Sequence, residues 1–166
     1  FLEGDGLDLG CFQVVSRALC KNLEGCQAVV LFAATLGVGV DGLIRKYSRL
    51  QMSRAVVMQA AAAAMLEDYC DEACGEIRQE YEKKGRHLRP RFSPGYGDFP
   101  LECQPALLTG LEAGKRIGIA LTDSFLMAPS KSVTAVIGVA SLNSEWGGGG
   151  CEACEKTDCT YRRNRA

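Results

Sequence analysis

One long stretch of helix-favouring residues constrains this fold more than any other feature of the sequence. Residues 53–84 are rich in alanine and lack a strong helix breaker, so they predict a single long helix. Ser53 is the expected N-cap, and Gly85, just past the end, is the expected C-terminal cap. Such a helix is much longer than the average of about 11 residues, so the pattern allows either an unbroken helix or a bend near Gly75.

The rest of the chain alternates between helical and strand-like segments. By the spacing of their apolar residues, further helices are predicted at residues 9–23, 40–50 and 105–113. By their apolar and β-branched content, strands are predicted at residues 28–34, 88–92, 117–127 and 132–140. The last two strands are expected to pair antiparallel through a turn at residues 129–131. This order predicts an α+β fold, with mixed helices packed on an antiparallel sheet, over a doubly wound sheet.

Length and composition fit one domain with a small appendage. The chain has 166 residues, and we expect an α+β domain over residues 1–146 and a glycine hinge with a cysteine-rich tail over residues 147–166. A formal net charge of −1 gives no reason to expect nucleic acid as a partner. No apolar run reaches the roughly 20 residues that a membrane span needs. The nine scattered cysteines are typical of a reducing compartment, so we expect a cytoplasmic protein.

Three glycines follow the predicted strand at residues 28–34. Gly37, Gly39 and Gly42 match the G-x-G-x-x-G pattern that brings a backbone close to a dinucleotide pyrophosphate. The full fingerprint also needs a second strand that ends in an acidic residue about 20 positions on. The alanine-rich helix occupies that place, so we interpret the glycines as a turn between strand and helix. A nucleotide-dependent enzyme is the minority alternative.

Three cysteines lie close together in the tail. Cys151, Cys154 and Cys159 follow the glycine hinge in a segment with little apolar content, so core packing does not explain them. Clustered thiolates suit an iron–sulfur cluster or zinc. Either needs a fourth ligand, for which Cys103 and His87 are candidates. The alternative is a tail with reduced, reactive thiols. A second pair, one helical turn apart at positions 70 and 74, is expected to pack in the core.

A loop between the long helix and the next one carries the most informative polar groups. Residues 93–100 contain two prolines and two glycines, which predict a structured loop. Arg91 offers a fork of donors and Tyr96 offers an aromatic face, and these suit a ligand that bears a carboxylate and a cationic group. The alternative is a structural loop whose Tyr96 covers the core. His87 is the only histidine, and no nucleophile motif accompanies it.

Three motifs in the middle of the chain together resemble one protein family. They are V-V-L-F-A-A-T-L-G at residues 29–37, R-x-S-P-G-Y at residues 91–96, and L-T-D-S-F-x-M-x-P-x-x-S-V at residues 121–133. In this combination the sequence resembles the activation domain of cobalamin-dependent methionine synthase, and more closely its small stand-alone versions. With the helix around Glu67, the resemblance spans most of residues 26–140.

The resemblance implies a ligand and the residues that bind it. The family has a mixed α+β fold with an antiparallel sheet and binds S-adenosylmethionine (AdoMet). Carried over to this sequence, Arg91 binds the carboxylate of AdoMet, Ser93 and Gly95 contact the ligand through their backbone, and Tyr96 lies beside them. Glu67 is the match for a helical glutamate that contacts the amino group. As a solvated helix residue, Glu67 has a competing, purely structural interpretation.

The resemblance also implies an accessory module, with no catalytic residue of its own. Such a module docks on a cobalamin-carrying methionine synthase subunit and supports the reductive methylation of inert cob(II)alamin. A flavodoxin-like or ferredoxin-like protein is the expected electron donor. Cobalt and the sulfonium perform the chemistry, so no general base or nucleophile is expected on this chain. The alternative function is a cysteine-cluster redox protein that does not bind AdoMet.

Overall fold

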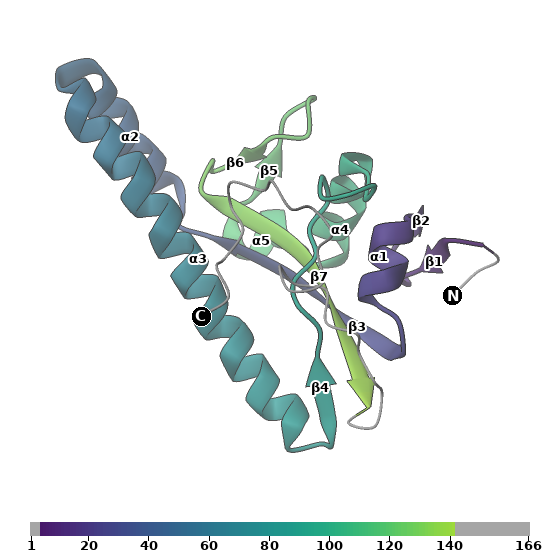
Figure 1. The fold of residues 1–166 in the computed structure, drawn as a ribbon. Coiled ribbons are helices and arrows are strands. Elements are labelled where there is room, and N and C mark those ends of the chain that lie inside the picture. The colour runs from purple at the N-terminus through teal and green to yellow at the C-terminus, as the bar shows by residue number, and fades with distance from the viewer. Residues whose placement is uncertain (1–3, 142–166) are drawn as a thin grey trace, which may run out of the picture.

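The computed structural model describes residues 4–141, which form a small central sheet with helices and short hairpins around it (Figure 1). The helices are α1 Arg17–Asn22, α2 Val38–Leu50, α3 Met52–Glu82, the 3₁₀ helix η1 Leu101–Cys103, α4 Gln104–Gly110 and α5 Ala113–Ile117. The strands are β1 Gly6–Asp8, β2 Gln13–Val15, β3 Cys26–Thr35, β4 Arg86–Leu88, β5 Ala120–Leu121, β6 Met127–Ala128 and β7 Ser132–Ser141. The α+β prediction is confirmed. The domain boundary expected at residue 146 lies outside the described residues.

Strand β7 is the centre of the main sheet. It pairs antiparallel with β3 on one side, from Thr35 opposite Ser132 to Cys26 opposite Ala140, and with β4 on the other. Almost every residue of β7 is buried. Because both of its faces are apolar, the strand needs partners on both edges and cover on both faces.

The predicted pairing of the last two strands is wrong. Residues 117–127 do not form one strand, because α5 ends at Ile117 and only Ala120–Leu121 is extended, paired with β6. A tight turn follows, in which the Phe125 N–H donates to the carbonyl of Thr122 and Phe125 has a φ of 59°. The β-branched residues of this segment were therefore misleading, and β7 pairs instead with strand β3, far away in the sequence.

The long helix is confirmed as one unbroken element. α3 runs from Met52 to Glu82 without a bend at Gly75, and it lies along one side of the sheet (Figure 1). The expected cap at Ser53 is wrong: extended Gln51 precedes the helix and makes no side-chain capping bond. The buried stripe of α3 consists of Ala55, Ala62, Leu66, Cys70 and Cys74. The packing interpretation of the two helical cysteines is therefore confirmed, since both contribute to the cluster of apolar side chains beneath α3.

The N-terminal segment differs from its prediction. Instead of a helix at residues 9–23, a β1–β2 hairpin precedes the short helix α1. The Asp98 carboxylate, from the loop after β4, accepts hydrogen bonds from the Ser16 hydroxyl (2.6 Å) and from the backbone N–H of Arg17 (2.8 Å) and Ala18 (3.0 Å). Ser16 is the local N-cap of α1, since its hydroxyl accepts from the Leu19 N–H at 3.1 Å, and the distant Asp98 completes the cap.

The loop at residues 93–100 is anchored by Phe99. Its ring is almost fully buried and stacks between Phe12 and Phe92, with ring centroids 6.4 and 6.3 Å apart. The turn interpretation of the glycine motif is confirmed only for Gly37, which has a φ of 78° and directly precedes α2; Gly39 and Gly42 lie inside that helix. Within residues 4–141, no helix is long and apolar enough to cross a membrane.

Candidate functional site

A cavity of about 350 Å³ lies between α3, the loop after β4, the start of α4 and strand β7. Its lining consists of Glu67, Arg91, Phe92, Ser93, Pro94, Tyr96, Gln104, Met127, Val133 and Thr134. Four of the five residues predicted to bind a ligand, Glu67, Arg91, Ser93 and Tyr96, thus meet around one space. A pocket of this size can hold a small organic ligand.

Gly95, the fifth predicted residue, shapes the loop but does not line the cavity. Its φ is 93°, a conformation that side chains disfavour, and its N–H donates to the carbonyl of Phe99 at 2.8 Å. An added Cβ would lie only 3.2 Å from the side chain of Leu101. Glycine is therefore needed for the backbone path that places Tyr96 and Ser93 at the cavity.

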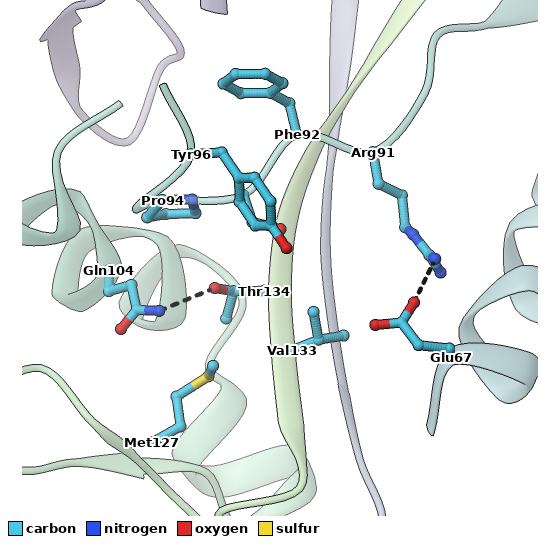
Figure 2. A pocket seen from close by; sticks show the side chains of 10 residues that line it. Glu67, Arg91, Phe92, Pro94, Tyr96, Gln104, Met127, Val133 and Thr134 are labelled. Carbon is cyan, nitrogen blue, oxygen red and sulfur yellow. Dashed lines mark hydrogen bonds and ion pairs between the residues drawn. The ribbon is translucent and has the colours of Figure 1, made fainter. Parts of the chain in front are cut away.

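One wall of the cavity carries paired opposite charges. Nη2 of Arg91 lies 3.0 Å from Oε2 of Glu67 and 2.9 Å from Oδ1 of Asp71 (Figure 2 shows the pair with Glu67). Sequence reasoning missed Asp71, although it follows Glu67 by four residues and so shares its helix face. A cation beside an anion matches the carboxylate and ammonium groups of an α-amino acid.

The guanidinium of Arg91 is held partly inside the protein. Its side chain is 21% exposed, whereas the carboxylates of Glu67 and Asp71 are 66% and 77% exposed. Nη1 is buried and has no hydrogen-bond partner among the described residues. Burial raises the pKa of the nearby Cys74 thiol, and the positive charge of Arg91 and its hydrogen bond to the thiol partly offset that rise. The guanidinium is therefore a mostly buried cation, and such a group favours binding of an anion.

Tyr96 does not cover the core. Tyr96 is 67% exposed, and Figure 2 shows its ring above Thr134 in the view, among the residues that line the cavity. Phe99, three residues later, fills the core instead. The structural alternative for Tyr96 is therefore wrong, and the ring is available to a ligand.

The opposite wall was not foreseen from the sequence. Gln104, Met127 and Thr134 lie across strand β7 from the charged pair (Figure 2). Gln104 begins α4 and donates from Nε2 to Oγ1 of Thr134 at 3.4 Å, and only 4% of its surface is exposed. Thr134 lies in the central strand β7, and its side chain lines the cavity. A single glutamine at a predicted helix start gave no signal of this arrangement.

The predicted metal ligands Cys151, Cys154 and Cys159 lie outside the described residues. Within residues 4–141, no group of three or more His, Cys, Asp or Glu side chains could hold a metal ion. Of the candidates for a fourth ligand, His87 is half-buried in β4 and Cys103 is half-buried at the end of η1. The metal site stays a prediction.

Comparisons with known proteins identify the family of this chain and a similar fold. The family model described as "Vitamin B12 dependent methionine synthase, activation domain" matches residues 19–164. Among solved structures, the fold is similar to the MetH reactivation domain bound to AdoHcy, with 22% identity and a TM-score of 0.59. That alignment covers 71% of this chain and 41% of the solved chain, so this chain spans less than half of that protein's length. No curated protein matches the sequence.

Proposed function

Because this chain belongs to the activation-domain family of vitamin B12-dependent methionine synthase, we propose that it binds AdoMet and supports the reductive methylation of cobalamin on a partner subunit. The observation that carries the proposal is the Arg91–Glu67 pair opposite Tyr96 in one cavity. That set of groups complements a ligand with an α-amino acid end and a sulfonium. The AdoHcy bound to the structurally similar reactivation domain supports the same class of ligand.

The charged wall suggests how the amino acid end would bind. The ligand carboxylate accepts hydrogen bonds from the guanidinium of Arg91, whose side chain is 21% exposed. The ligand ammonium then replaces Arg91 as the partner of Glu67. Asp71 keeps its contact with Nη2 of Arg91 and so holds the guanidinium in place during the exchange. Ser93 and Gly95 contribute through the backbone of the loop.

The positive sulfonium fits the middle of the cavity. The face of an aromatic ring attracts cations, and Tyr96 presents such a face. The carboxylates of Glu67 and Asp71 add negative potential on the charged wall, which lowers the free energy of placing a cation nearby. Both effects favour AdoMet over its neutral demethylated product.

The chemistry needs positioning rather than acid–base groups on this chain. One electron reduces cob(II)alamin, the methyl group moves from the sulfonium to cobalt, and AdoHcy leaves while methylcobalamin forms. This chain binds AdoMet and orients its methyl group toward the opening of the cavity. Tyr96 and Glu67 at that opening are largely exposed, so another protein's cobalamin could approach them. A cobalamin-carrying methionine synthase subunit is the proposed partner, with a flavodoxin-like or ferredoxin-like electron donor.

The cysteine-rich tail enters the proposal separately. Thiolates at positions 151, 154 and 159 suit zinc or an iron–sulfur cluster, and a cluster there would provide a relay for the electron. Within residues 4–141, the residues that line the cavity lie between positions 67 and 134, so we expect AdoMet binding to be independent of the tail.

Calorimetric titration of the reduced protein with AdoMet and AdoHcy tests the binding step. The proposal predicts one ligand per chain with a dissociation constant in the micromolar range, and far weaker binding of methionine or adenosine alone. Methionine lacks the nucleoside and adenosine lacks the charged end, so each fragment fills only part of the cavity. If neither AdoMet nor AdoHcy binds, the proposal is overturned.

A further inference from the structure

The buried carboxamide of Gln104 is incompletely satisfied in the cavity wall. Its Nε2 makes one long hydrogen bond to Thr134, at 3.4 Å, and its Oε1 is buried without a hydrogen-bond partner among the described residues. Thr134 itself is 1% exposed. A buried polar atom without a partner lowers the stability of a folded protein, so its presence in a cavity wall calls for a ligand or a structural reason.

A structural reason is hard to find. Gln104 is one turn from Leu107 and Leu108, which are buried, so an apolar side chain would suit this place in α4. The hydrogen bond to Thr134 does not account for the whole carboxamide of Gln104 either, because it involves only the nitrogen end and leaves the oxygen without a partner. Exchanging the oxygen and nitrogen of the carboxamide still leaves one polar end without a partner, but that end is then a donor. With the oxygen free, as the structure has it, Gln104 is an acceptor.

The place of Gln104 in the cavity indicates which part of a ligand it meets. Arg91 and Glu67 lie on one side of β7, and Gln104, Met127 and the Tyr96 ring lie on the other (Figure 2). With the amino acid end of AdoMet on the charged pair, the adenosine end extends toward Gln104. Adenosine carries hydrogen-bond donors that match an orphan amide oxygen, namely the 6-amino group and the ribose hydroxyls.

We propose that Gln104, positioned by Thr134, is a specificity-determining residue that accepts a hydrogen bond from the adenosine part of the ligand. The inference rests on the proposed AdoMet site and deepens it. It predicts opposite effects on stability and on binding. Removing the amide relieves an unsatisfied group in the free protein, but it takes a partner away from the bound nucleoside.

The test is Gln104→Met, which keeps the length and most of the volume of the side chain. We expect its melting temperature to equal or exceed that of the unchanged protein, while its affinity for AdoHcy in calorimetry falls about 10-fold. Two further ligands distinguish the donors. If the amino group is the donor, S-inosylhomocysteine, with oxygen at that position, binds the unchanged protein weakly and Gln104→Met no worse. If a ribose hydroxyl is the donor, the AdoHcy analogue that lacks that hydroxyl binds the unchanged protein weakly, and Gln104→Met binds it no worse.

The outcomes separate this inference from the proposed function. If Gln104→Met binds AdoHcy as tightly as the unchanged protein, while Arg91→Ala binds much more weakly, the inference is wrong and the AdoMet site stands. A large drop in melting temperature with unchanged affinity makes Gln104 a structural residue and also overturns the inference. If the unchanged protein does not bind AdoHcy at all, both proposals are overturned. Gln104→Glu, which keeps an acceptor, is expected to bind AdoHcy more tightly than Gln104→Met.

Discussion

Replacing Arg91 with alanine separates the binding role of this residue from its structural one. In the ligand-free protein, the side chain makes two ion pairs with carboxylates of α3 that are 66% and 77% exposed. Solvent screens such pairs, and each contributes at most about 1 kcal/mol. Arg91→Ala should therefore lower the free energy of unfolding by about 1 kcal/mol, which corresponds to about 2–4 °C in melting temperature for a chain of this size.

The expected effect on binding is larger. A guanidinium that is mostly withdrawn from water makes charge-assisted hydrogen bonds to a ligand carboxylate, each of which contributes about 1.5–3 kcal/mol. Loss of about 2–3 kcal/mol weakens AdoHcy binding roughly 30- to 150-fold. Arg91→Lys keeps the charge but not the fork of donors, so its affinity should lie between those of Arg91→Ala and the unchanged protein.

Two measurements on the same samples decide the matter: calorimetric titration with AdoHcy and denaturant unfolding. Arg78→Ala is the matched control, because Arg78 is an exposed arginine of α3, the helix that carries Glu67 and Asp71, and it does not line the ligand cavity. We expect the control to bind AdoHcy as the unchanged protein does. The reasoning is refuted if Arg91→Ala binds AdoHcy within threefold of the unchanged protein, or if Arg78→Ala loses as much affinity.

Three further predictions concern α3 and the tail. In calorimetry, Glu67→Gln should weaken AdoHcy binding about 10-fold, because it loses the charged partner of the ligand ammonium. Asp71→Asn should weaken binding less, because Asp71 only supports Arg91. Equal losses of affinity in the two variants would contradict these roles. Burial raises the pKa of Cys70 to about 11, so the folded state keeps its thiol protonated while the unfolded chain ionises near pH 9. The free energy of unfolding should therefore fall by about 2–3 kcal/mol as the pH rises from 9 to 11, because only the unfolded chain loses the Cys70 proton in that range. In urea unfolding, Cys70→Ala should not show this decrease, and parallel pH profiles of the two proteins would argue against the reasoning. Changing all three tail cysteines to serine should remove any zinc or iron measured by elemental analysis but leave AdoHcy affinity unchanged, and a loss of affinity would connect the tail to the cavity.

Local patterns in the sequence predicted the elements that form from local causes. The alanine-rich composition of α3 and the apolar run of β3 are sufficient to indicate their type and nearly their bounds. Prediction failed for elements whose bounds depend on contacts with residues far away in the sequence. Asp98 completes the N-terminal cap of α1 from about 80 positions away, and the periodicity of residues 9–23 contains no trace of it.

The same distinction applies to the candidate site. The loop residues Arg91 and Tyr96 were found because their chemistry is unusual beside prolines and glycines. Asp71 was within reach, since it shares a helix face with Glu67. Gln104 and Thr134 were not, because only the pairing of β7 with β3 and β4 and the packing of α4 bring them to the cavity. Sheet pairing between distant strands depends on tertiary packing, which a single sequence encodes weakly.

The most direct test of the account follows the methyl group itself. AdoMet labelled in its methyl group is mixed with this protein, a one-electron reductant and a methionine synthase polypeptide that carries cob(II)alamin but lacks its own activation domain. We predict that the label appears on cobalt, that one AdoHcy forms per methyl transferred, and that Arg91→Ala greatly slows both at AdoMet concentrations near the dissociation constant of the unchanged protein. If the unchanged protein binds AdoMet and the cobalamin polypeptide but no label reaches cobalt, the reactivation function is contradicted.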